Sequence, residues 1–119
     1  MTRLASLLAA GALLASCTGV TIKDPAQGLY VAESALIGAM QVATTYAQLP
    51  ACGTGVALCS DPATVAKIKA DAQTASAAVL TAQGVVTANG SAAQIAAAVS
   101  VAEAAVSALQ ADTATLKVN

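Results

Sequence analysis

The sequence predicts an all-α fold, an up-down-up bundle of three helices. Alanine, the strongest helix former, supplies 33 of the 119 residues. Helix-start signals stand at three places, and each is followed by apolar residues that alternate at spacings of three and four. The connections between the three segments are short, and this favours neighbouring antiparallel helices.

The first predicted helix begins at Asp24-Pro25 and runs to about Gln48. Asp24 is a favourable N-cap, proline is favoured at the first helical position, and Gln27 is placed for a capping box. Leu49-Pro50 ends the helix, because the residue before a proline avoids the helical conformation. One face is polar and the opposite face is apolar. The polar positions are Gln27, Ser34, Gln41 and Gln48, and the apolar positions are Leu29, Ala32, Leu36, Ala39, Ala43 and Tyr46.

The second and third predicted helices carry similar signals. Asp61-Pro62 repeats the first start, and Asn89-Gly90 closes the second helix because both residues tolerate the left-handed conformation. Ser91 begins the third helix at once, with Gln94 completing a capping box. The apolar seam of the second helix is Val65, Ile68, Ala72, Ala75, Val79, Ala82 and Val86; that of the third is Ile95, Val99, Ala102, Val106, Leu109, Thr113 and Leu116.

Two glycines, Gly38 and Gly84, fall inside the predicted helices. Each costs up to about 1 kcal/mol relative to alanine in a helix interior. We expect close approach of a neighbouring helix to explain them. The alanine-rich seams bury little apolar area, and we expect Tyr30 and Ile37, which flank the first seam, to remain exposed for a second copy or a partner protein.

Cys52 and Cys59 lie in the connection between the first and second helices. Export to an oxidising compartment would make a structural disulfide the expected pairing, and the intervening glycines let the short ring close. Free thiols and intermolecular bonds are the alternatives. A metal site would need further ligands, and the chain has no histidine. A redox centre would be expected to show the tighter Cys-x-x-Cys spacing.

No group of residues predicts catalysis, a cofactor or a metal. Without histidine, a serine or cysteine nucleophile lacks its usual base. Five of the six acidic side chains have a structural explanation: Asp24 and Asp61 are caps, Asp71 pairs with Lys67 one turn back, and Glu33 and Glu103 are solvated. Charge is sparse and nearly balanced, with no basic patch, so we expect no nucleic-acid partner, and no small-molecule substrate is evident. We expect a non-enzymatic module.

The amino terminus has the pattern of a targeting segment. Arg3 supplies a positive start, and residues 4–15 form an uncharged run, shorter than the roughly 20 residues that span a bilayer. The run ends in Leu14-Ala15-Ser16-Cys17, which resembles the lipobox of bacterial lipoprotein precursors. The resemblance implies cleavage before Cys17, thioether lipidation of its thiol and a further acyl chain, such as palmitate, on the freed amine. An ordinary secretory signal is the alternative.

This interpretation divides the chain into a signal peptide over 1–16, a lipidated tether over 17–24 and the bundle over 25–119. By resemblance to proteobacterial lipoproteins, Thr18 in place of an aspartate favours the outer membrane, with the bundle facing the periplasm. The membrane would then be bound through acyl chains on Cys17, and a homo-oligomer or an envelope protein would be the partner.

A second resemblance lies in the connection. The segments 46–53 and 58–62 are similar to small uncharacterised lipoproteins of proteobacterial prophage regions near lysis genes. That similarity implies a phage context and carries no functional residues. Two functions follow: a lipid-anchored envelope protein with a structural or protein-interaction role, or a phage-encoded membrane-active lysis or exclusion lipoprotein.

Overall fold

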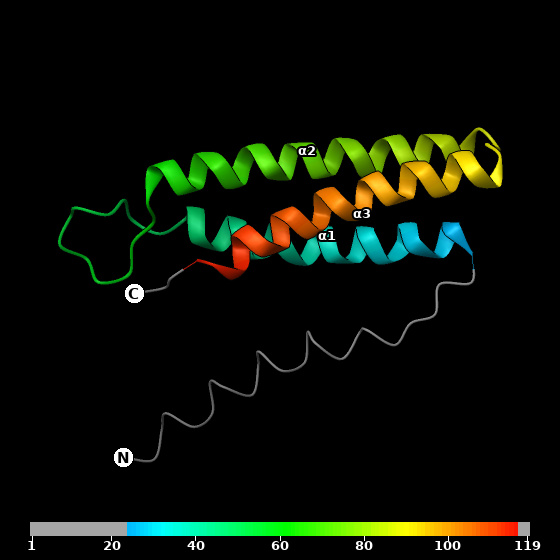
Figure 1. The fold of residues 1–119 in the computed structure, drawn as a ribbon. Helices are drawn as coiled ribbons and strands as arrows, with labels where there is room; N and C mark the ends of the chain where they lie inside the picture. The colour runs from blue at the N-terminus through cyan, green and yellow to red at the C-terminus, as the bar shows by residue number, and fades with distance from the viewer. Residues whose placement is uncertain (1–23, 117–119) are drawn as a thin grey trace, which may run out of the picture.

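A computed structural model of the chain describes residues 24–116, which form three helices. The helices are α1 (Pro25–Ala47), α2 (Pro62–Thr87) and α3 (Ala92–Ala114). All three pack against one another, and α3 contacts each of the other two more extensively than α1 and α2 contact each other. Figure 1 shows α1 and α2 side by side in opposite directions, with α3 crossing in front of α1. The predicted all-α, up-down-up bundle is confirmed.

Parts of the predicted organisation lie outside the described residues. These are the signal peptide, Cys17, most of the tether and the last three residues, 117–119. Within 24–116 the helix boundaries agree with those expected from the sequence to within a residue or two. Apart from the helices, the described chain has one isolated bridge, between Ala51 and Ser60.

The predicted N-caps are present at all three helix starts. The carboxylate of Asp61 accepts from the Thr64 N–H at 2.8 Å, and Ser91 forms the full capping box with Gln94. In α1 the Asp24 carboxylate accepts from the Ala26 N–H at 3.0 Å. The expected capping box with Gln27 is therefore replaced by a bond to the second helical position. These bonds satisfy amide groups that have no partner inside a helix.

The turn from α2 to α3 is a Schellman motif. The Asn89 N–H donates to the Val86 carbonyl at 3.1 Å, and the Gly90 N–H donates to the Val85 carbonyl at 2.9 Å. Asn89 adopts the left-handed conformation, with φ of 53°. Gly90 is required for a different reason, because an added Cβ would lie 2.7 Å from Val85 Cγ1. The sequence prediction of a helix end at Asn89-Gly90 is confirmed.

The core runs along the predicted seams. Ala75, Ala82, Ala102 and Leu109 are completely buried, so three of the four most enclosed side chains are single methyl groups. Small residues at these positions let the helix axes lie close, but they bury little apolar area. The buried hydrophobic residues are Leu29, Ala32, Leu36, Ala39, Tyr46, Ile68, Ala75, Val79, Ala82, Val99, Ala102, Val106 and Leu109.

The explanation expected for the two helical glycines is wrong. A Cβ built on Gly38 or on Gly84 meets no atom within 4 Å, and both residues are exposed. Neither position is a close approach between helices. Their cost in helix propensity is therefore not offset by packing in this bundle.

By length and composition, α3 could cross a membrane. Its mean hydropathy over the most apolar window is 1.6, and it is the one helix among the described residues that meets this criterion. In the bundle its seam residues Val99, Val106 and Leu109 are buried between α1 and α2.

Candidate functional site

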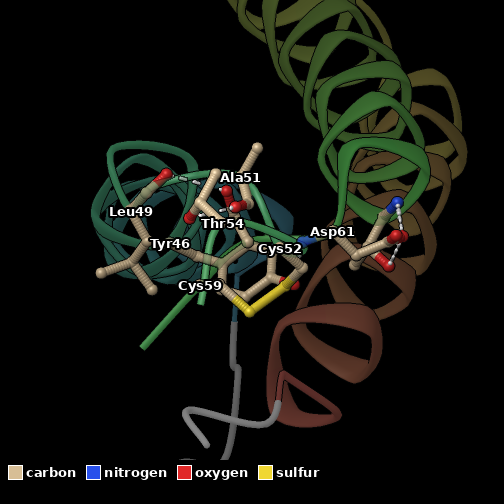
Figure 2. Close-up of a disulfide and its surroundings, with 9 residues drawn as sticks. Tyr46, Leu49, Ala51, Cys52, Thr54, Cys59 and Asp61 are labelled. Atoms are coloured by element: carbon tan, nitrogen blue, oxygen red, sulfur yellow. Dashed lines mark hydrogen bonds between the residues drawn. A yellow bond between two sulfur atoms is a disulfide. The ribbon is translucent and has the colours of Figure 1, made fainter. Parts of the chain in front are cut away.

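Three features of the chain can carry function: the predicted lipidation site, the disulfide-closed connection, and the surface shared by α1 and α2. Cys17, the predicted lipidation site, lies outside the described residues, so its modification remains a prediction. Cys52 and Cys59 form the expected disulfide between α1 and α2, with their Cα atoms 4.8 Å apart (Figure 2). The pairing expected from the sequence is confirmed.

The base of this connection is held by hydrogen bonds around Ser60. The Cys52 N–H donates to the Ser60 carbonyl at 3.0 Å, and the Ser60 N–H donates to the Pro50 carbonyl at 2.8 Å. The Ser60 hydroxyl, which is buried, donates to the Leu49 carbonyl at 3.0 Å. These bonds hold the two arms of the connection side by side next to the disulfide. The disulfide therefore joins two segments that backbone hydrogen bonds already hold side by side.

Tyr46 links the last turn of α1 to the first turn of α2. Its ring is buried in the core, and its phenolic oxygen accepts from the Asp61 N–H at 2.9 Å (Figure 2). Sequence reasoning placed Tyr46 in the α1 seam but missed this bond. The available signal was the general rule that the hydroxyl of a buried tyrosine finds a partner. Asp61 thus has its amide held by Tyr46 while its carboxylate caps α2.

The tip of the loop is apolar. Val56 and Leu58 are about half exposed, and residues 53–58 carry no charge. Gly53 and Gly55 adopt φ of 101° and 79°, which side chains other than glycine rarely allow. Figure 1 shows the loop projecting beyond the helices, at the opposite end of the bundle from the start of α1.

A small ionic cluster joins α2 to α3. Lys67 Nζ donates to Asp71 Oδ2 at 2.9 Å, as expected from their spacing, and also to Asp112 of α3. The hydrogen bonds from Lys67 lower the pKa of Asp112, and those to Asp112 and Asp71 raise the pKa of Lys67. The pKa of Asp61 is lowered because its carboxylate accepts from the amide and then the hydroxyl of Thr64. All three groups make these hydrogen bonds at the surface of the bundle.

The outer surface shared by α1 and α2, here the α1–α2 face, is open and mixes polar with exposed apolar side chains. Two contacts bridge it: Gln83 Nε2 donates to Glu33 Oε1 at 2.6 Å, and the Ser76 hydroxyl donates to Met40 Sδ at 3.9 Å. Glu33 is half-buried, so the expectation that it is a solvated position is wrong. Its carboxylate accepts the hydrogen bond from Gln83 and thereby links α1 to α2.

Between and beside these contacts lie exposed apolar side chains. Tyr30 and Ile37 of α1 are 69% and 58% exposed, and Leu80 of α2 is 65% exposed. The expectation that Tyr30 and Ile37 stay exposed is confirmed. Next to them a groove of about 230 Å³ runs toward the disulfide end. It is lined by Met40, Ala43, Thr44, Ala47, Val65, Ile68, Lys69 and Ala72.

Within the part of the chain that the structure describes, no three His, Cys, Asp or Glu side chains come together as metal ligands. Comparison of the chain with protein-family models, with curated proteins and with solved structures gives no match.

Proposed function

We propose that the chain is the precursor of a small lipid-anchored protein of the bacterial envelope, with a structural or protein-interaction role rather than an enzymatic one. The observation that carries the proposal is Leu14-Ala15-Ser16-Cys17, at the end of an uncharged run that follows Arg3. Lipidation of Cys17 would fix the mature protein to a membrane, by our interpretation the outer membrane. Two or more acyl chains are needed for stable anchoring.

The geometry of the bundle supports this role. Cys17 precedes the first residue of the fold by seven positions, a tether that reaches at most about 25 Å when extended. The bundle therefore stays close to the membrane surface. Its described residues offer exposed apolar side chains on the α1–α2 face and an apolar loop tip, both of the kind that a protein partner covers.

The proposal is tested by metabolic labelling in a Gram-negative host. The chain should incorporate labelled palmitate and fractionate with the outer membrane, and Cys17→Ser should abolish labelling and normal processing. Cys59→Ser is the matched control, because it removes a cysteine elsewhere and should leave labelling intact. If the Cys17→Ser protein is still cleaved before residue 17 and remains membrane-bound, the chain is not a lipoprotein.

A second candidate function is favoured by the composition of α3. A lipoprotein that disrupts or seals a membrane would need a helix able to enter it, and α3 has the length and hydropathy for this. In this alternative the protein is a phage-encoded lysis or exclusion factor. Expression should then depolarise or lyse the host, and Val101→Asp, which adds a second charge beside Glu103 in the middle of α3, should abolish that effect. Growth without leakage at high expression would exclude it.

A further inference from the structure

The α1–α2 face carries two charges, one of each sign, and they lie toward its opposite ends. Glu33 is the only charged residue of α1. Of the three charged residues of α2, Lys67 and Asp71 are engaged with each other and with α3, and this leaves Lys69, which lines the groove on the α1–α2 face. The other side chains of the face are uncharged.

These charges are placed symmetrically about one contact. The Met40–Ser76 contact bridges the two helices. Glu33 precedes Met40 by seven residues, and Lys69 precedes Ser76 by seven residues on the antiparallel helix. Each charge therefore lies about 10 Å along the bundle from this contact, in opposite directions.

This arrangement is complementary to itself. A two-fold axis that lies in the plane of the face, and crosses the helices at the Met40–Ser76 contact, reverses the helices of a second copy. It brings Lys69 of that copy to the height of Glu33, and the same pairing occurs a second time by symmetry. An axis parallel to the helices would instead set Glu33 against Glu33 and Lys69 against Lys69. The charges thus select the reversed arrangement.

The area of the face is also adequate. From Tyr30 to Ala47 it is about 27 Å long, and two adjacent helices are about 20 Å wide, which gives about 500 Å² on each copy and about 1,000 Å² in total. That is near the lower limit for a specific protein interface. The exposed side chains of Tyr30, Ile37 and Leu80 would supply its apolar contacts.

We propose that two copies of this chain associate through their α1–α2 faces, in the reversed two-fold arrangement, with Glu33 of each copy near Lys69 of the other. The proposal identifies a partner for the protein-interaction role above but does not require lipidation. If both copies are lipidated, their anchors lie at opposite ends of the dimer, and its long axis runs along the membrane surface.

The test is a charge exchange in the full chain. Two differently tagged copies are co-expressed, solubilised in detergent, and their association is measured by co-purification over a dilution series. Glu33→Lys and Lys69→Glu should each weaken self-association about tenfold, because attraction becomes repulsion twice per dimer. Glu33→Lys mixed with Lys69→Glu should recover the original association, because both pairs are again opposite in sign. Glu103→Lys, an equal change of charge on the exposed surface of α3, should have no effect.

A photo-reactive amino acid at Ile37 provides a measurement that does not depend on the folding of charge variants. It should yield a covalent product of twice the mass of one chain. The proposal is overturned if the two single variants associate with themselves as strongly as the original chain does, if mixing them restores nothing, or if the Ile37 product contains a different protein. Since Cys17→Ser removes only the anchor, its crosslinking at Ile37 should persist, and this separates failure of lipidation from failure of the dimer.

Discussion

Replacing Gly38 and Gly84 by alanine should stabilise the bundle. Both lie inside exposed stretches of helix, and a Cβ at either position meets no atom within 4 Å. Alanine therefore gains helix propensity, and reduces the conformational entropy of the unfolded chain, without any steric cost. Each substitution should raise the free energy of unfolding by about 0.5–1 kcal/mol. Because the two sites share no neighbours, the double variant should gain about 1–2 kcal/mol, or roughly 5–15 °C in Tm for a domain of this size.

The assay is thermal and urea unfolding followed by the helical circular dichroism signal. Gly90→Ala is the matched control, because the same change there places Cβ 2.7 Å from Val85 Cγ1 and 3.0 Å from the Val85 carbonyl oxygen. It should destabilise the bundle by about 1 kcal/mol or more. If Gly38→Ala or Gly84→Ala lowers the Tm, a neighbour must approach that position closely, and the open surroundings described above are wrong.

Three further predictions concern the contacts between helices. Cys52→Ser with Cys59→Ser should lower the free energy of unfolding by about 2.5 kcal/mol while preserving the helical dichroism, because the loop-entropy effect of a short ring acts on the connection; an unchanged urea midpoint would contradict this. Tyr46→Phe should cost about 1 kcal/mol, because the Asp61 N–H loses its acceptor, and equal unfolding midpoints for the two proteins would contradict it. Stability should fall as the pH drops below about 4, because Asp61 and Asp112 have lowered pKa values in the folded state. Their ionised carboxylates stabilise the fold fully above the pKa of the unfolded chain, and this stabilisation is lost as the pH falls through the pKa of the folded state. Asp61→Asn, which keeps an N-cap, should flatten that acid slope in pH-dependent unfolding.

The fold was predictable because its determinants are local and periodic. The alternation of spacings in α2 and α3 identified the buried positions directly, since residues three and four apart share a helix face. Caps such as Ser91 with Gln94 need only the four residues that form them. The disulfide was predictable because the chain has three cysteines and Cys17 is assigned to lipidation. The remaining two, Cys52 and Cys59, flank a short loop that contains glycine.

The contacts between helices that sequence reasoning missed join residues distant in the chain. The Lys67–Asp112 pair, the Glu33–Gln83 bond and the Tyr46–Asp61 bond depend on how one helix is rotated and shifted against another. Helical periodicity predicts which face of a helix is buried. It does not predict how far one helix is shifted along its axis relative to another. For this reason Asp71 was correctly paired with Lys67, one turn away, whereas Asp112 was not.

The wrong explanation for Gly38 and Gly84 has a related cause, and the same packing pattern concerns the α1–α2 face. Glycine in a helix has several explanations, and only the surroundings of its Cα distinguish them; here Gly38 and Gly84 face open space. Alanines such as Ala75 and Ala102 are instead completely buried, and α1 and α2 contact each other less than either contacts α3. The side of the bundle with the least internal packing therefore carries the exposed Ile37 and Leu80. Covering that side in a dimer would add apolar burial where the single chain lacks it. Association and folding would then be thermodynamically linked, so the stability of the bundle would rise with the concentration of the protein.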